Sequence, residues 1–231
     1  MKSIQAVVER PGLWRVFING EEVPALENSY WIERQFPRYA IGGHVRPGMN
    51  TLTLKAPRMD VLAELMPVYI LGDFLVRPAP RGFEITGGDI GSPGSWRDAG
   101  LPFYSQTVAY TQQFNIAGSG GSAFRVKLNR WNGTVAEVLV NGERAGLIAF
   151  PPNELDVTGM LKEGINDITV KVTGSLKNTF GFFYRENGYS WIYGPWEWDY
   201  APARIPPGDE YFLLDYGLME PFALVRTGTE A

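Results

Sequence analysis

The sequence predicts an all-β protein, an antiparallel β-sandwich that occurs in two unequal copies. Short runs rich in Val, Ile, Phe, Tyr and Thr are bounded by turn residues along the whole chain. The 27 glycines and 17 prolines favour many turns and disfavour long helices. The regular strand–helix alternation of a parallel-sheet enzyme is missing. Strands are expected at Trp14–Ile18, Thr51–Lys55, Val68–Val76, Val108–Phe114, Phe124–Leu128, Ala136–Val140, Asp167–Val172 and Phe222–Arg226.

An internal repeat indicates the two copies. The matching segments are VFINGEEV from Val16 with VLVNGERA from Val138, and YAIGGHVRPGMNTLTLKA from Tyr39 with LDVTGMLKEGINDITVKV from Leu155. Each copy has an Asn-Gly pair between two β runs, which is the strongest short hairpin signal because both turn positions require a positive φ. We therefore expect Asn19-Gly20 and Asn141-Gly142 to form equivalent turns.

The two copies differ in completeness. Only 18 residues precede the Asn-Gly turn of the first copy, so we expect this copy to lack its opening strands. We predict that residues 1–80 form a short or incomplete β-sandwich unit, which needs the second copy or a dimer to close. Residues 81–231 are predicted to form a complete sandwich. They carry a long aromatic insertion at residues 173–210, and long insertions between framework strands often have a function.

Three segments of the second copy carry a family resemblance. They are GLPFYSQTVAYTQQFNI from Gly100, VAEVLVNGERAG from Val135 and ELDVTGMLKEGINDITVKV from Glu154. In this order they resemble the jelly-roll, galactose-binding-like domain of family 2 glycoside hydrolases and related carbohydrate-binding modules. The resemblance implies a jelly roll for residues 81–231. It transfers no catalytic residue, because the acid and the nucleophile of that family lie in a barrel that this sequence lacks.

Composition excludes several kinds of partner and site. A net charge of −4 disfavours nucleic acid and anionic membranes, since both need a basic patch. The absence of cysteine excludes disulfides and thiolate metal sites. We expect no cofactor, although a structural calcium held by backbone carbonyls would leave no sequence motif. The first residues lack the apolar run of a signal peptide, so an extracellular or periplasmic location would require a leader on a longer parent chain.

The aromatic insertion is the strongest candidate for ligand binding. In FGFFYRENGYSWIYGPWEWDY, residues 180–200, ten of 21 residues are aromatic. Sugar rings stack on such side chains through their C–H groups, while nearby charged side chains bind the hydroxyls. The candidate sugar-binding residues of the insertion are Arg185, Trp191, Tyr193, Trp196, Glu197 and Trp198. The alternative is that these rings cap the sandwich or pack against another domain.

A second candidate cluster precedes the first strand of the second copy. Trp96, Arg97 and Asp98 lie in a Gly- and Pro-rich loop, and Tyr104 follows closely. Loops at one end of a sandwich can converge, so we expect this cluster to meet the insertion and to contribute a ring and two polar partners. The alternative is a surface ion pair beside a packing tryptophan.

These features predict a non-catalytic carbohydrate-binding module for a plant or microbial polysaccharide or oligosaccharide. One alternative is a structural accessory domain that packs on the catalytic domain of a glycoside hydrolase and binds no sugar itself. Another is a small jelly-roll glycosidase that uses Glu197 and Asp199, since two carboxylates can hydrolyse a glycoside. His44 is the only histidine, so the sequence predicts neither a histidine metal pair nor a catalytic triad.

Overall fold

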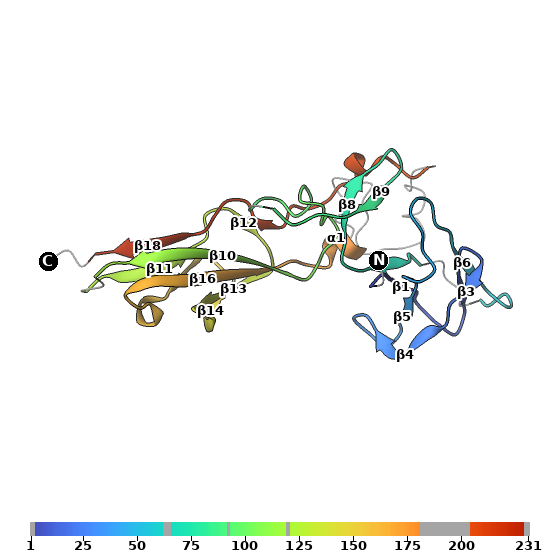
Figure 1. Cartoon of the computed structure of the whole chain (residues 1–231), viewed down its shortest axis with the longest axis horizontal. Helices are drawn as coiled ribbons and strands as arrows, with labels where there is room; N and C mark the ends of the chain where they lie inside the picture. The colour runs from blue at the N-terminus through green and yellow to red at the C-terminus, as the bar shows by residue number, and fades with distance from the viewer. Residues whose placement is uncertain (1–2, 62–65, 92, 119–120, 181–203, 229–231) are drawn as a thin grey trace. The chain divides into compact units, whose positions relative to one another are not determined.

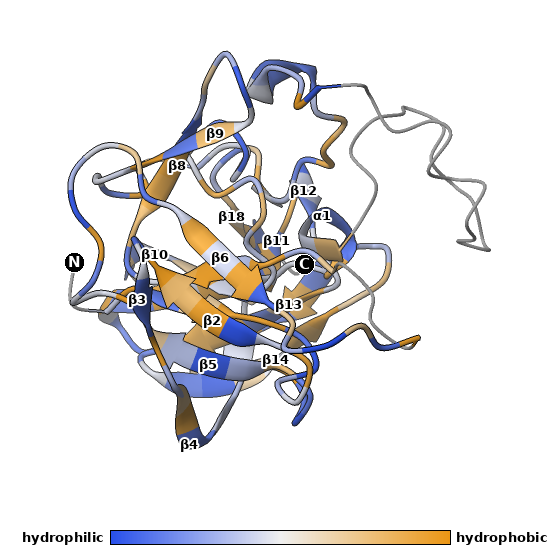
Figure 2. Ribbon diagram, turned by 90° about the vertical axis from the view of Figure 1, so that its right-hand side faces the viewer, coloured by the Kyte–Doolittle hydropathy of each residue, from blue (hydrophilic) through white to orange (hydrophobic). Residues whose placement is uncertain are grey.

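A computed structural model describes residues 3–61, 66–91, 93–118, 121–180 and 204–228. All ladders between its strands are antiparallel (Figure 1). Helix in the described residues is limited to α1, Lys177–Phe180, and the short 3₁₀ turns η1, Thr158–Met160, and η3, Gly208–Glu210. In β2, Arg15–Ile18, buried and more exposed residues alternate, and its apolar residues stand out in Figure 2. The predicted all-β class is confirmed.

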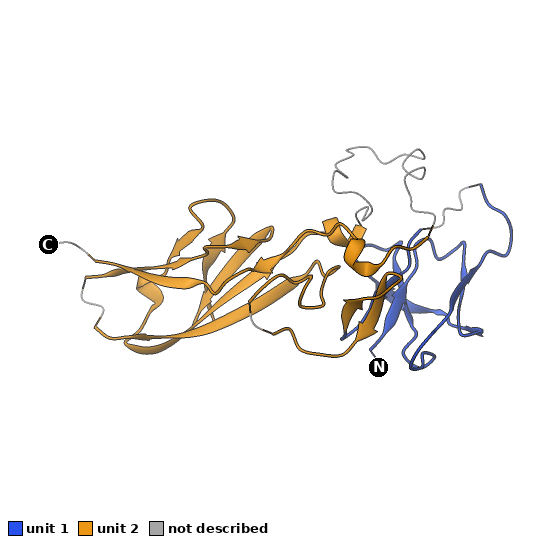
Figure 3. Cartoon of the chain, turned by 90° about the horizontal axis from the view of Figure 1, so that it is seen from above, with its two compact units in different colours: residues 1–74 blue, residues 75–231 orange. Residues whose placement is uncertain are grey.

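The chain divides into two compact units, Met1–Phe74 and Leu75–Ala231 (Figure 3). The remaining strands of unit 1 are β1, Gln5–Val7; β3, Glu21–Glu22; β4, Ala25–Tyr30; β5, Pro37–Ala40; β6, Leu52–Lys55; and β7, Tyr69–Leu71. They form a four-stranded sheet in the order β4-β5-β1-β7 and a three-stranded sheet in the order β3-β2-β6. Ala6 and Tyr39 from the first sheet share one hydrophobic core with Val16 and Ile18 from the second. Unit 1 thus has the two-layer arrangement of a sandwich.

Unit 2 is larger and has a core of its own. Its strands are β8, Leu75–Pro78; β9, Phe83–Thr86; β10, Thr107–Ile116; β11, Ala123–Lys127; β12, Trp131–Asn132; β13, Val135–Val140; β14, Glu143–Ile148; β15, Glu154–Asp156; β16, Gly164–Thr173; β17, Gly217–Leu218; and β18, Ala223–Thr227. The main sheets have the orders β10-β16-β13-β14 and β15-β11-β18, beside the pairs β12-β17 and β8-β9. Val126 of β11, Val138 of β13 and Val170 of β16 are fully buried in the common core.

In unit 1 the Asn-Gly turn is closed by a second asparagine. Asn19 and Gly20 both have positive φ, as their turn requires. The Asn19 side chain donates from Nδ2 to Asn50 Oδ1 at 2.9 Å and accepts from the Thr51 backbone N–H at 3.0 Å. Asn50 in turn accepts from Arg46 N and donates to the carbonyl oxygens of Arg46 and Gly48. We call this pair of side chains the asparagine clasp.

Unit 2 repeats the asparagine clasp except for one bond: Asn19 Nδ2 also donates to the His44 carbonyl oxygen at 2.8 Å, and no such bond is described for Asn141. Asn141 Nδ2 donates to Asn166 Oδ1 at 2.9 Å, and Asn141 Oδ1 accepts from Asp167 N at 3.1 Å. Asn166 accepts from Lys162 N and donates to the carbonyl oxygens of Lys162 and Gly164. The repeat predicted from sequence therefore extends to the hydrogen bonds of its turns.

The strand orders also correspond, except that β4 of unit 1 and β10 of unit 2 have no counterparts among the described strands. The order β5-β1-β7 of unit 1 matches β15-β11-β18 of unit 2, and β3-β2-β6 matches β14-β13-β16. The strand β10 pairs with β16 over ten residues, whereas β6 pairs only with β2 among the described strands. The described part of unit 1 thus has no counterpart of β10. Correspondingly, Ile168 and Val170 of β16 are 0% exposed, whereas Leu52 and Leu54 of β6 are only partly buried.

Candidate functional site

The structure places Trp96 in the core of unit 2 and leaves it only 2% exposed. Its indole lies between Gly174 and Gly217, where an added Cβ would come within 2.8 Å and 2.6 Å of indole atoms. The indole Nε1 donates to Tyr110 Oη at 2.6 Å, so its polar group is satisfied inside the protein. Because the ring is buried, neither of its faces is accessible to a sugar. Trp96 is therefore a core residue and not the sugar contact that we expected.

Tyr104 also packs against the core. Its ring meets that of Trp96 edge to face, with centroids 5.8 Å apart, and its hydroxyl donates to the carbonyl oxygen of Thr107 at 3.3 Å. Burial raises the pKa of Tyr104 above its ordinary value. The residue thus supports the neighbouring loop, and its hydroxyl already has a partner.

Arg97, in contrast, lines a cavity of about 630 Å³ in unit 2. The other lining residues come from the end of β12, the glycine that follows it and the segment before β17: Asn132, Gly133, Tyr211, Phe212, Leu213, Leu214, Asp215 and Tyr216. The cavity combines aromatic rings with an amide, a carboxylate and a guanidinium group. This mixture of apolar walls and a few polar groups is typical of small-molecule sites.

The polar side of the cavity is centred on Asp215. Its Oδ1 accepts a hydrogen bond from Ser95 Oγ at 2.6 Å and lies 3.4 Å from Arg97 Nη2. Arg97 Nε also lies 3.3 Å from Asp98 Oδ1, so the guanidinium contacts two carboxylates. The Arg97 and Asp215 side chains remain 42% and 41% exposed. They therefore form an oriented donor–acceptor pair that solvent, or a ligand hydroxyl, can reach.

Buried polar groups hold the segment that lines the cavity. Asn178, which is 2% exposed, donates from Nδ2 to the carbonyl oxygens of Pro102 and Leu214 and accepts from Leu214 N. Tyr216 Oη lies 2.5 Å from Ser175 Oγ, and the Tyr216 carbonyl oxygen accepts from Trp96 N. Asp215 is thus held between two anchored residues, an arrangement that favours a preformed site.

The aromatic side of the cavity is part of a ring cluster. Tyr211 lies edge to face with Phe83 and Phe103, at centroid distances of 5.2 Å and 6.5 Å. Tyr211 and Phe212 are both partly exposed. The cavity thus brings apolar ring atoms next to the Arg97–Asp215 pair, which offers both a donor and an acceptor.

The fold is similar to portions of glycoside hydrolases. A rhamnosidase from Novosphingobium sp. PP1Y matches with 19% identity and a TM-score of 0.40, over 98% of this chain and 22% of that enzyme. A β-glucuronidase from Bifidobacterium dentium, solved with coumarin-3-O-glucuronide, matches with 20% identity and a TM-score of 0.40, over 67% of this chain and 28% of its own. A β-D-mannosidase from Dictyoglomus thermophilum matches with 19% identity and a TM-score of 0.27, over 44% of this chain and 15% of its own.

This chain therefore spans less than a third of the length of the enzymes that it matches. No family model matches the sequence, and no curated protein matches it either. In the described part of the chain, no helix is long and apolar enough to cross a membrane. Nor do the described residues include a group of three or more His, Asp or Glu side chains suited to a metal ion.

The predicted site is only partly covered by the described residues. Those outside them are Arg185, Trp191, Tyr193, Trp196, Glu197 and Trp198, so their expected sugar contacts stay predictions. In the loop cluster, Arg97 lines the cavity and forms an ion pair with Asp98, whereas Trp96 and Tyr104 pack in the core of unit 2. Sequence reasoning missed Asp215 and Tyr211. Their one sequence signal was their position beside the aromatic insertion, which does not reveal that they meet Arg97.

Proposed function

We propose that this chain is a non-catalytic carbohydrate-binding part of a larger glycoside hydrolase-like protein. Its unit 2 binds a plant or microbial polysaccharide or oligosaccharide in the cavity beside Arg97. The sugar stacks on the rings of Tyr211 and Phe212, and its hydroxyls bond to Arg97 and Asp215. Its protein partner is a catalytic domain of the same parent protein.

The observation that carries this proposal is the Arg97–Asp215 pair on the wall of an aromatic cavity. Arg97 Nη2 lies 3.4 Å from Asp215 Oδ1, so both groups are within reach of neighbouring hydroxyls of one sugar ring. A neutral ligand also suits a chain with a net charge of only −4. Stacking and a few net hydrogen bonds, less the cost of association, give an affinity of roughly micromolar to millimolar.

The direct test is affinity electrophoresis of the whole chain in gels that contain xylan, β-glucan, mannan, galactan or pectin. We expect at least one polysaccharide to retard the chain, and Arg97→Ala to weaken that binding by about tenfold, because a hydrogen bond to a charged group contributes about 1.5 kcal/mol. Asp215→Asn should weaken binding less. It keeps an oxygen for Ser95 but removes the charge that faces Arg97.

Arg77→Ala is the matched control. Arg77 is an exposed arginine of β8 that pairs with Glu84 at 3.0 Å and does not line the cavity. Its substitution should leave the retardation unchanged. Wild-type mobility that is equal in every gel would contradict the proposal and favour the structural accessory domain. Release of reducing sugar by the purified chain would contradict the non-catalytic role.

A further inference from the structure

Strand β6 of unit 1 pairs on one side only among the described strands. In an antiparallel pair, successive residues direct their backbone N–H and C=O groups alternately toward the two sides of a strand. Asn19 N donates to Thr51 O at 2.8 Å, so Thr51 and, two residues further on, Thr53 direct these groups toward β2. The backbone polar groups of Leu52 and Leu54 therefore point to the other side, where no described strand pairs with β6. We call this side the β6 edge.

The equivalent edge of unit 2 is covered by β10. The repeat aligns Leu52 and Leu54 with Ile168 and Val170 of β16. The carbonyl oxygen of the residue before Ile168 accepts from Asn141 N at 2.7 Å, so Ile168 and Val170 direct their backbone groups away from β13 and toward β10. The protein thus shows, in its second copy, the kind of element that occupies this edge.

The burial of the side chains differs in the same way. Leu52 and Leu54 pack against the core of unit 1 but stay partly exposed, whereas Ile168 and Val170 are fully buried. Unpaired backbone groups beside partly exposed apolar side chains form a template for another strand. The β6 edge offers both kinds of group, in the same register as the covered edge of β16.

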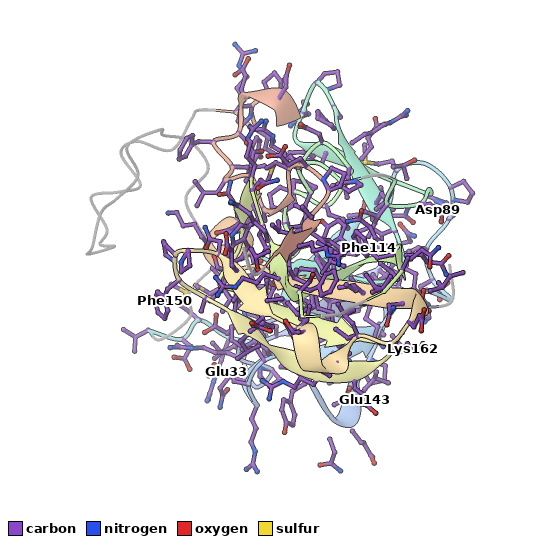
Figure 4. All side chains as sticks on the ribbon, turned by 90° about the vertical axis from the view of Figure 1, so that its left-hand side faces the viewer. Glu33, Asp89, Phe114, Glu143, Phe150 and Lys162 are labelled. Carbon is purple, nitrogen blue, oxygen red and sulfur yellow. The ribbon has the colours of Figure 1, made fainter. Side chains whose placement is uncertain are left out.

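The sequence of β10 indicates which side chains such a strand needs. Val108 and Ile116 are buried in the core of unit 2, and Tyr110 and Phe114 pack against it. Phe114, labelled in Figure 4, meets Phe222 with ring centroids 5.9 Å apart. The residues between these positions are exposed. A strand that covers the β6 edge therefore needs apolar side chains at alternate positions.

We infer that the β6 edge is a docking site for an extended segment of a partner polypeptide. The segment lies antiparallel to β6, exchanges backbone hydrogen bonds with Leu52 and Leu54, and places alternate apolar side chains over the core of unit 1. In strand addition of this kind, main-chain bonds provide affinity and the alternate side chains provide specificity. The inference goes beyond the proposed function, since it involves no sugar and concerns unit 1, whereas the cavity beside Arg97 lies in unit 2.

The probe is a synthetic peptide with the sequence of β10, TVAYTQQFNI, which is labelled for fluorescence anisotropy and titrated with the whole chain. We expect saturable binding. In β10 the N–H groups of Tyr110 and Gln112 face β16, and those of Thr111 and Gln113 face away from it. N-methylation of the peptide at the first pair should weaken binding about tenfold or more, because it removes hydrogen bonds to β6. N-methylation at the second pair is the control and should leave binding nearly unchanged.

Amide hydrogen exchange followed by NMR locates the peptide on the chain. The Thr53 N–H faces β2 and serves as the internal control, whereas the N–H groups of Leu52 and Leu54 face the β6 edge. In the chain alone we expect the amides of Leu52 and Leu54 to exchange about tenfold faster than that of Thr53 or more, and the peptide to slow them. Slow exchange of Leu52 and Leu54 without peptide would mean that the chain itself covers this edge, and would overturn the inference.

Leu54→Pro tests the β6 edge from the side of the chain. Its missing N–H faces away from β2, and edge strands tolerate proline at such a position. Leu147→Pro is the matched control: Leu147 lies in the edge strand β14, opposite Glu137, so its N–H also faces away from its partner strand. We expect Leu54→Pro to weaken peptide binding about tenfold or more and Leu147→Pro to leave it unchanged, each with a thermal melt close to that of the wild type. If Leu54→Pro does not fold, the two methylated peptides decide.

Sedimentation velocity distinguishes a partner polypeptide from a second copy of the chain. A wild-type dimer that Leu54→Pro dissociates would mean that β6 pairs with another copy, and would overturn the inference. Equal binding of the two methylated peptides, or no binding of the unmodified peptide, would overturn it as well. None of these results bears on the retardation of the chain by polysaccharides, so the proposed function stands or fails separately.

Discussion

Trp96 fills a slot that exists only because two distant positions lack side chains. Gly174 and Gly217 are 43 residues apart, yet both lie against the indole. Sequence reasoning could mark the aromatic residue but not these neighbours, because their proximity depends on the completed fold. The same limit explains why Arg97 was predicted as a candidate while Asp215, its partner across 118 positions, was not.

The burial of Trp96 leads to a prediction at the residue scale. Trp96→Ala should lower the free energy of unfolding by about 3–5 kcal/mol, since it removes a large core side chain and its hydrogen bond to the Tyr110 hydroxyl. Urea denaturation followed by far-UV circular dichroism measures this loss. Phe150→Ala should change stability by less than about 0.5 kcal/mol because Phe150 is 82% exposed. A Trp96→Ala chain as stable as the wild type would show that the indole is not a core residue.

Two turns contrast what local sequence does and does not reveal. The Asn-Gly turns followed from sequence, because the residue pair itself demands positive φ at both positions. The γ-turn at Ile32 gave no such signal, since isoleucine avoids this conformation and only the surrounding hairpin holds it there. Local chemistry thus predicted the turns of the framework but not the strained turn at Ile32, which the Glu33 N–H closes by donating to the Trp31 carbonyl oxygen.

The strands β6 and β16 provide a comparison at the element scale. Leu52 and Ile168 occupy equivalent positions, but Ile168 is 0% exposed in a strand that β10 and β13 flank, whereas Leu52 is only partly buried in β6, which pairs only with β2 among the described strands. We expect Ile168→Ala to cost about 2–5 kcal/mol and Leu52→Ala distinctly less. Hydrogen exchange of the β6 and β16 peptides, followed by mass spectrometry, measures the two effects separately.

An equal or larger effect of Leu52→Ala would contradict this expectation. It would mean that another segment covers the edge of β6 in solution and buries Leu52 as fully as β10 buries Ile168. The expectation that the first copy needs the second copy or a dimer would then gain its first support; at present it stays a prediction.

Across the whole molecule, the repeat was the most informative sequence signal. It predicted the two copies, their equivalent turns and the shorter leader of the first copy, because matching segments recur in the same order in both copies. The boundary between the two units, in contrast, depends on which strands pair with each other. Pro78-Ala79-Pro80 has the composition of a linker, yet it lies at the connection between β8 and β9, within the compact unit that begins at Leu75.

The asparagine clasp also affects how the protein ages chemically. In an asparagine followed by glycine, the next backbone nitrogen can attack the side-chain amide carbon and expel ammonia, and water then opens the cyclic imide to aspartate or isoaspartate. Both clasps contain such a pair. In the folded chain the amides of Asn19 and Asn141 are held by bonds to Asn50 and Asn166, so the attacking geometry is blocked. Conversion would replace an N–H donor with a carboxylate oxygen facing Asn50 Oδ1 or Asn166 Oδ1, and would loosen the turn.

We therefore expect deamidation at Asn19 and Asn141 to be much slower in buffer than in urea at the same mildly alkaline pH. Peptide mapping by mass spectrometry over a storage series would follow both sites. Equal rates in the two solvents would mean that the clasps give no protection. If only one site is protected, the unit that contains the other site opens more often. The positions of the deamidated asparagines in an old sample would then identify that unit.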